Sequence, residues 1–183
     1  DVIAGADMFL GLSGPSVMTQ DHVRQMTKQP IVFALANPTP EILPDLVREV
    51  APDAIIATGR SDFPNQVNNV LCFPFIFRGA LDVGATQIND EMQLACIEGI
   101  AELARATTSA EAAAAYQGEQ MTFGVDYLIP KPFDPRLVGI VSSAVAKAAM
   151  ETGVATRPIE DLEAYKTKLD GSVFKSALVM RPV

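Results

Sequence analysis

The sequence predicts an α/β fold in which a short parallel sheet is followed by a series of helices. Three short apolar runs bounded by Gly, Pro, Asn or Asp are typical of buried strands: Met8–Leu12, Ile31–Ala36 and Ala54–Thr58. The runs do not alternate with polar residues, which favours a parallel sheet covered on both faces. Because helical patterns separate the runs, we expect part of a Rossmann-like, doubly wound sheet with right-handed crossovers.

Two helices are expected between these strands. In Thr19–Met26, Thr19 can cap the helix and Asp21 falls in its first turn. In Glu41–Val50, Pro40 is expected at the first turn. Apolar residues recur there at helical spacing, namely Ile42, Leu46 and Val50.

After Arg60 the pattern becomes helical. The expected C-terminal helices are Asn69–Val83, Asn89–Arg105, Pro135–Thr152 and Glu160–Leu169. The first of these is expected to be a buried helix with a kink at Pro74. Asn89 is the expected cap of the second. The alanine-rich run Ala110–Ala115 fits a helix or a link between helices. From the abrupt start and the apolar end, Val173–Val183, we expect a longer natural chain.

Composition excludes several classes of function. The 183 residues carry a net charge of −8, which argues against nucleic acid or an anionic membrane surface as a partner. No signal peptide or long apolar span is evident. Cys72 and Cys96 stand in apolar surroundings without metal-ligand spacing, so they fit buried thiols of a reducing, cytoplasmic compartment.

Small and amide residues follow all three expected strands. Ser13 and Gly14 follow the first, Asn37 the second and Gly59 the third. Ligands of open parallel sheets bind at the carboxyl ends of strands, and small residues there allow a flat ligand to approach the backbone. The alternative, that these residues only form tight turns, stays open.

A second candidate site precedes the apolar helix, where residues 65–69 read NQVNN. Asn68 and Asn69 stand next to the expected helix start, whose free N–H groups favour a carboxylate. This predicts an anionic small molecule as ligand. An ordinary asparagine cap is the alternative.

No catalytic constellation can be assembled from the chain. His22, the only histidine, lies on an expected surface helix and is interpreted as structural. Lys131 and Arg136 flank a proline-rich helix entry and fit capping or solvated roles. The scattered Asp53, Asp62 and Asp82 offer no metal cluster, and no glycine-rich phosphate loop is present.

Three longer strings carry a resemblance to a known family. They are PIVFALANPTPE at residues 30–41, IIATGRSDFPNQVNNV at 55–70 and CFPFIFRGALD at 72–82. These strings resemble bacterial malic enzymes over nearly the whole chain. The resemblance implies that residues 1–155 are the C-terminal portion of an NAD(P)-binding domain and that residues 156–183 lead towards a following domain.

Malic enzymes oxidise (S)-malate with NAD or NADP and a divalent cation, Mg²⁺ or Mn²⁺, and release pyruvate and CO2. The resemblance implies that Asn37 and one of Asn68 and Asn69 bind malate, and that Ser13–Gly14, Asn37 and Gly59 face the nicotinamide. The family's acid, base, metal ligands and glycine-rich loop have no counterpart in this chain. We therefore expect no catalytic residue here, a cation held by another part of the enzyme, and no activity of this chain alone.

Three interpretations remain. The chain can be a malic-enzyme fragment, a non-catalytic α/β binding or regulatory module, or an interaction piece whose helical half serves dimerisation. Malic enzymes commonly assemble as dimers or larger oligomers, so the resemblance implies that this protein is a homo-oligomer.

Overall fold

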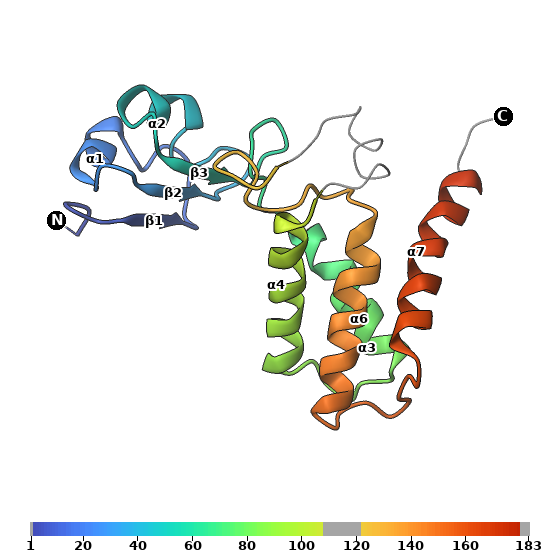
Figure 1. Ribbon diagram of the computed structural model, residues 1–183. Helices are drawn as coiled ribbons and strands as arrows, with labels where there is room; N and C mark the ends of the chain where they lie inside the picture. The colour runs from blue at the N-terminus through green and yellow to red at the C-terminus, as the bar shows by residue number, and fades with distance from the viewer. Residues whose placement is uncertain (1, 108–121, 180–183) are drawn as a thin grey trace. The chain divides into compact units, whose positions relative to one another are not determined.

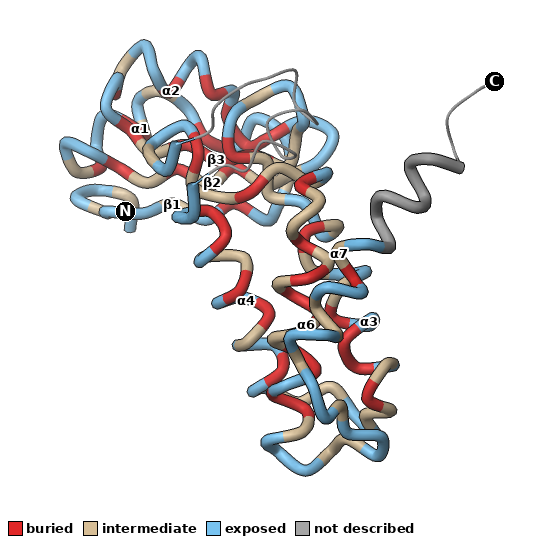
Figure 2. The backbone as a smooth tube through the Cα atoms, turned by 45° about the vertical axis from the view of Figure 1, so that its right-hand side comes forward, coloured by how far each residue is buried: buried red, intermediate tan, exposed pale blue. Residues whose placement is uncertain are grey.

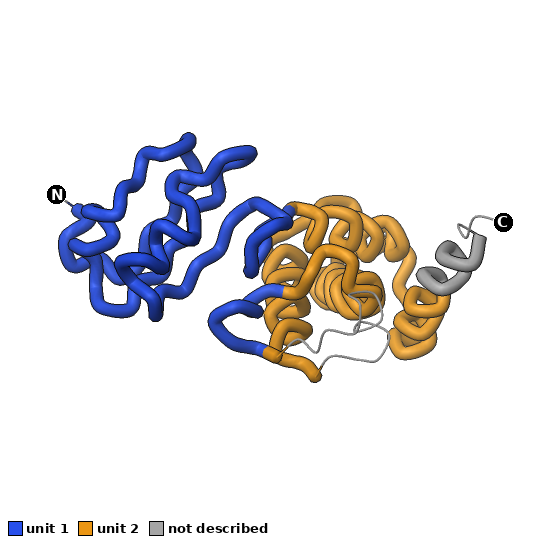
Figure 3. The backbone as a smooth tube through the Cα atoms, turned by 90° about the horizontal axis from the view of Figure 1, so that it is seen from above, with its two compact units in different colours: residues 1–68, 123–129 blue, residues 69–122, 130–183 orange. Residues whose placement is uncertain are grey.

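The chain divides into two compact units (Figure 3). The computed structural model describes residues 2–107 and 122–179, with side chains described up to residue 171. The first unit comprises residues 1–68 and 123–129, and the second comprises residues 69–122 and 130–183. The run Ala110–Ala115 and residues 180–183 lie outside the described residues.

The first unit contains the expected parallel sheet (Figure 1). Its strands are β1 (Met8–Gly11), β2 (Ile31–Ala34) and β3 (Ile55–Thr58), paired in that order. The register places Met8 beside Ile31 and Ile31 beside Ile55. All pairings are parallel, as expected for strands joined by helical crossovers. The predicted α/β fold class is therefore confirmed.

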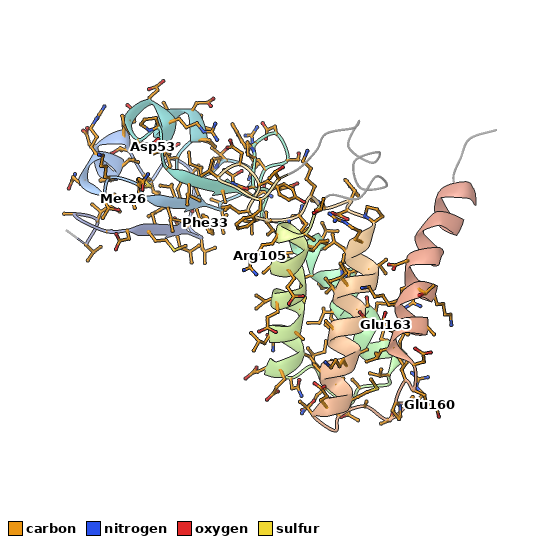
Figure 4. The ribbon with its side chains drawn as sticks, in the orientation of Figure 1. Met26, Phe33, Asp53, Arg105, Glu160 and Glu163 are labelled. Carbon is orange, nitrogen blue, oxygen red and sulfur yellow. The ribbon has the colours of Figure 1, made fainter. Side chains whose placement is uncertain are left out.

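Both crossover helices, α1 (Gln20–Gln25) and α2 (Pro44–Val50), cover the same face of the sheet. Residues of α1, α2 and alternate strand positions share one buried cluster, which includes Val23, Val32, Ala34, Val47 and Ile56. Met26, labelled in Figure 4, belongs to this cluster at the end of α1. The core of the unit therefore lies between the sheet and these two helices.

The opposite face of the sheet is more open than the sequence pattern predicted. Met8 and Leu10 on β1 are 45% and 54% exposed, and Phe33 on β2 is half-buried. Two right-handed crossovers in the same direction place both helices on one side of the sheet. The expectation that both faces are covered is therefore wrong for β1, one of the two edge strands of this sheet.

The two helix starts differ in how well the sequence predicted them. Thr19 caps α1 as expected, and His22 Nδ1 accepts a hydrogen bond from the Thr19 N–H at 3.2 Å. This supports the structural interpretation of His22. Helix α2 begins at Pro44 rather than at Glu41, because Pro44 takes the first turn after an extended Leu43. The predicted role of Pro40 is wrong, and Val47 rather than Leu46 faces the core.

The second unit is a group of helices around α6. They are η1 (Asn69–Leu71), α3 (Phe73–Asp82), α4 (Asp90–Arg105), α6 (Arg136–Glu151) and α7 (Leu162–Val179). Helix α6 contacts α3, α4 and α7, and its buried residues include Leu137, Val141, Val145 and Ala149 (Figure 2). Among the described residues, no helix is both long and apolar enough to cross a bilayer.

Two helical predictions need correction. The sequence predicted one kinked buried helix over Asn69–Val83, but the structure has a short 3₁₀ turn followed by α3. Pro74 lies in the first turn of α3, where backbone N–H groups have no partner within the helix, so a proline there removes no helical hydrogen bond. Helix α3 is also exposed along one side, where Phe73, Phe77 and Leu81 lie. Helix α7 begins at Leu162 and extends beyond Leu169, the predicted end. The predicted cap of α4 is confirmed, since Asn89 Oδ1 accepts a hydrogen bond from the Met92 N–H.

Helices α3 and α6 approach closely at Gly79. A Cβ added at Gly79 would lie 2.5 Å from the Ser142 carbonyl oxygen and 2.9 Å from Val145 Cβ. Ser142 Oγ donates a hydrogen bond to the Phe75 carbonyl oxygen at 3.1 Å across the same contact. The glycine therefore sets the distance between the two helices.

This packing predicts that Gly79→Ala destabilises the helical unit by about 1–3 kcal/mol, because the added methyl forces the helices apart. Gly171→Ala is the matched control, since Gly171 is exposed on α7 and has open space around it. The control is expected to raise stability by up to about 1 kcal/mol through helix propensity. Urea unfolding followed by circular dichroism measures both. Equal stability of the two variants would contradict the packing argument.

Candidate functional site

The carboxyl ends of the three strands bring the predicted loops to one edge of the first unit. Gly11, Ala34 and Thr58 are neighbours in the sheet register, so Ser13, Asn37 and Gly59 all follow at the same edge. A Cβ added at Gly59 would lie 3.9 Å from Asn37 Cβ and 3.3 Å from the Leu35 carbonyl oxygen. The loops after β2 and β3 are therefore in close contact.

A buried carboxylate joins the loops after β1 and β2. Glu41 is 0% exposed. Its Oε1 accepts hydrogen bonds from the Ser13 N–H at 2.8 Å and from Ser13 Oγ at 3.3 Å. Its Oε2 accepts one from the Ala36 N–H at 3.1 Å. Because Ala36 directly precedes Asn37, one side chain fixes the backbone beside two of the predicted contacts.

The surroundings of Glu41 favour its ionised form. Burial alone would raise the pKa of this carboxyl, but hydrogen bonds from Ser13, Ala36 and its own backbone N–H together lower it below the ordinary value. Space for the carboxylate comes from Gly11, because a Cβ there would lie 2.5 Å from Glu41 Cδ. The glycine that ends β1 is therefore needed to admit the acid.

The loop after β3 is fixed by a different buried polar side chain. Asn65 Nδ2 donates hydrogen bonds to the carbonyl oxygens of Ile56 at 2.8 Å and Val125 at 2.7 Å. Its Oδ1 accepts one from the Leu128 N–H at 2.7 Å. Asn65 thus links residues 123–129 to β3. This amide of the NQVNN string has a structural role.

The paired asparagines fall on either side of the division between the units. Asn68 is exposed in the first unit, and Asn69 is exposed at the start of η1 in the second. The Asn69 carbonyl oxygen accepts a hydrogen bond from the Cys72 N–H at 3.1 Å. Ser13 and Asn37 are also exposed, whereas Gly14 and Gly59 are half-buried.

Sequence reasoning missed Glu41, which it placed in the first turn of a helix. A signal was present, because an acid between Pro40 and the buried Ile42 is enclosed by apolar chain. Buried carboxylates need donors, and the strand-end backbone supplies them. Neither Ser13 nor Ala36 could be identified as a donor from sequence spacing, since their contacts depend on the sheet register.

The remaining polar residues form structural contacts. Asp62 pairs with Arg60 at 2.6 Å, and Asp82 pairs with Arg78 at 2.6 Å and accepts from Tyr165 Oη at 2.8 Å. Arg136 pairs with the buried Asp134 at 2.7 Å, and Asp134 Oδ1 accepts a hydrogen bond from the Arg136 N–H at 3.0 Å, so Asp134 rather than Arg136 supplies the side-chain acceptor at the start of α6. Among the described side chains, those of residues 2–107 and 122–171, no group of three or more His, Cys, Asp or Glu could hold a metal ion.

A groove of about 430 Å³ lies elsewhere, among α4, α6 and α7 of the second unit. Its charged lining is mixed: Glu98, Glu102, Glu151, Glu163, Lys147 and Lys166. Lys147 lies 3.7 Å from Glu151, and Glu163 is labelled on α7 in Figure 4. Four glutamates and two lysines leave this lining acidic overall without a pattern that defines a ligand class, and no residue predicted for the site lies there.

Comparison with known proteins identifies the family. Residues 3–116 match the family described as malic enzyme, NAD binding domain. The chain belongs to this family. It is 63% identical over all 183 residues to the NADP-dependent malic enzyme of Escherichia coli and 59% identical over 183 residues to the NAD-dependent malic enzyme of Rhizobium meliloti. It spans 24% of the length of each of these relatives.

Solved structures of malic enzymes share the fold. The enzyme from Pyrococcus horikoshii is 36% identical, with a TM-score of 0.75 over 94% of this chain and 37% of its own. The enzyme from Entamoeba histolytica is 34% identical, with a TM-score of 0.76 over 97% of this chain and 35% of its own. The resemblance drawn from the sequence strings is therefore confirmed.

The buried acid of this malic-enzyme domain predicts a dependence of stability on pH. A carboxylate with a lowered pKa contributes stability above the ordinary glutamate pKa of 4.5, and this contribution is lost as the pH falls through the folded-state pKa. We expect Glu41→Gln to cost about 1–3 kcal/mol at about pH 7 and less at about pH 3. Urea unfolding across this range measures the difference. Asp45→Asn, an exposed acid on α2, is the control, and an equal pH dependence of both variants would contradict the role of Glu41.

Proposed function

We propose that this chain forms part of an enzyme that oxidatively decarboxylates (S)-malate to pyruvate and CO2 with NAD or NADP. The supporting observation is the meeting of three small or amide loops at one sheet edge, where Glu41 holds two of them and Gly59 packs against Asn37. This edge is where open parallel sheets bind ligands. The chain's share of the work is binding and orientation, with no catalytic residue of its own.

The loop residues suit the nicotinamide end of a dinucleotide. Gly14 has open space around its Cα, and Gly59 presents backbone where a side chain would crowd the Leu35 carbonyl. A flat ring can therefore approach both loops, with Ser13 at the rim. NAD or NADP, when bound, supplies the hydride acceptor of the reaction. The relatives named above include one NADP-dependent and one NAD-dependent enzyme at similar identity, so the proposal covers both cofactors.

The amides suit malate. Asn37 is exposed beside the Gly59 loop, and its side chain can donate to a carboxylate oxygen and accept from a hydroxyl. The exposed Asn68 and Asn69 offer a second amide, of which the proposal assigns one to malate. Fixing malate in this way lowers the entropic cost of reaching the reactive geometry. The Mg²⁺ or Mn²⁺ of the family's reaction is assigned to a part of the enzyme outside this chain.

The domain bounds, the location and the oligomeric state are also part of the proposal. Residues 1–155 would complete an NAD(P)-binding domain, and residues 156–183 would lead towards a following one. A cytoplasmic location and a homo-oligomer are expected on the same grounds. The exposed apolar side chains Phe73, Phe77 and Leu81 on α3 favour an interface with another copy. Sedimentation equilibrium of the chain tests this interface, and we expect an oligomer. A monomer at micromolar concentration would contradict the proposed interface.

A chimera provides the activity test. This chain replaces the matching 183 residues of the Escherichia coli relative, to which it is 63% identical, and malate-dependent NADPH formation is measured. We expect activity in the chimera and none in the chain alone. Asn37→Ala should lower kcat/KM for malate by about 10- to 100-fold, since it removes hydrogen bonds to a charged ligand. One of Asn68→Ala and Asn69→Ala should do the same.

Gln29→Ala is the matched control, because Gln29 is an exposed amide at the opposite edge of the same sheet. It should leave the kinetics unchanged. Wild-type kinetics in the Asn37 variant, or in both paired-asparagine variants, would contradict the assignment of those residues to malate. Activity in the isolated chain would show that the acid and base were wrongly placed outside it.

A further inference from the structure

Glu41 stands behind the loops that carry the proposed ligand contacts, without any exposed surface of its own. One carboxylate oxygen binds Ser13 through its N–H and hydroxyl, and the other binds the N–H of Ala36. The Ala36 bond fixes the peptide that leads directly into Asn37. The two loops are therefore held by opposite oxygens of one rigid, planar group.

We propose that Glu41 is the positioning residue for malate in this site, acting through Asn37, whose preceding peptide it holds against the Ser13 loop. The proposal rests on the proposed function, since it assumes that Asn37 meets malate. Glu41 itself does not touch malate. An ionised carboxylate is suited to this task because it only accepts hydrogen bonds and can face a donor on each oxygen. A glutamine of the same size would turn an NH2 group towards one of the two loops.

Packing alone does not account for a charge at this position. An apolar side chain could fill the same space without the cost of burying an ion. Strand β1 also carries a glycine at residue 11, where any Cβ would lie within 2.5 Å of the Glu41 carboxyl carbon. Two positions in the sequence thus serve one pair of hydrogen-bonded loops, which indicates that the relative placement of those loops matters.

A double-mutant cycle in the chimera tests the proposal. Glu41→Gln alone should raise KM for malate and lower kcat/KM by about tenfold, because Asn37 is no longer held in place. If Glu41 acts through Asn37, adding Glu41→Gln to Asn37→Ala should lower kcat/KM by less than threefold further. A full, independent loss in the double variant is what a merely structural role would give, and it would overturn the proposal.

The outcomes separate this proposal from the proposed function. Wild-type kinetics for Asn37→Ala would contradict the proposed function. An impaired Asn37→Ala with wild-type kinetics for Glu41→Gln would overturn the positioning role alone. Asp45→Asn, which removes an exposed acid of α2, should leave KM and kcat unchanged.

Gly11→Ala gives a second route if Glu41→Gln does not fold. The added methyl displaces the carboxylate while its charge is kept, so the bonds to Ser13 and Ala36 should weaken. We expect the same rise in KM, again suppressed when Asn37 is already alanine. Wild-type KM in folded Gly11→Ala would overturn the proposal.

A separate observation concerns two thiols of the second unit. Cys72 and Cys96 are free, and Cys96 Sγ donates a hydrogen bond to Cys72 Sγ at 3.3 Å. Cys72 is half-buried at the start of α3, whereas Cys96 is buried on α4. Burial, with a contribution from Cys72, raises the pKa of Cys96 to about 12, so Cys72 is the thiol that an oxidant meets first.

We infer that this pair is a site of reversible oxidation, in which a peroxide converts the two thiols to a disulfide. The Cys72 thiolate attacks one oxygen of hydrogen peroxide, the O–O bond breaks, and the other oxygen leaves as hydroxide that is protonated to water, so Cys72 becomes a sulfenic acid. The Cys96 sulfur then attacks the Cys72 sulfur and displaces the hydroxyl as a second water, so two thiols and one peroxide give one disulfide and two waters. The Cys72 N–H donates a hydrogen bond to the Asn69 carbonyl oxygen, so the disulfide would form next to one of the paired asparagines.

Peptide mass spectrometry of the full chain after hydrogen peroxide treatment and alkylation tests this inference. We expect a Cys72–Cys96 linked peptide that dithiothreitol converts back to two alkylatable thiols. In Cys96→Ser, Cys72 should instead be trapped as a dimedone adduct of the sulfenic acid. Over-oxidation of Cys72 in the native chain with Cys96 still alkylatable, or only intermolecular disulfides, would overturn the inference.

Discussion

The first unit depends on an ionised carboxylate held inside it. Glu41 has no exposed surface, and its two oxygens bind the backbone at the ends of β1 and β2. Hydrogen bonds from these donors outweigh the effect of burial, so the pKa of the carboxyl lies below its ordinary value. One further feature follows from this charge: Gly11 lacks a side chain that would collide with the carboxylate.

The site at the sheet edge combines rigid support with exposed contacts. Glu41 and Asn65 are buried and fully engaged with backbone groups, whereas Asn37 and Asn68 are exposed. Buried polar groups of this kind fix the geometry of the residues in front of them. The arrangement supports the proposal that this chain, a member of the malic-enzyme NAD-binding family, binds and orients ligands.

Most helices and strands could be predicted from the sequence, because apolar runs and helix caps depend on residues that are close together in the chain. Apolar runs marked β1, β2 and β3, and the caps Thr19 and Asn89 marked two helix starts. The failures involve context. Pro44, rather than Pro40, starts α2, and the exposure of Met8 and Leu10 depends on which face the crossovers cover. At the site, the loops were predictable from strand ends, but Glu41 was not, because its partners are 28 and 5 residues away.

The most direct test of the account is hydrogen–deuterium exchange of the chimera with and without NADP and malate. The account predicts slower exchange in the peptides that contain Ser13, Asn37 and Gly59, with little change around the groove lined by Glu98 and Lys147. Protection confined to the α4, α6 and α7 groove, with none at the sheet edge, would contradict the claim that the strand ends of the first unit form the ligand site.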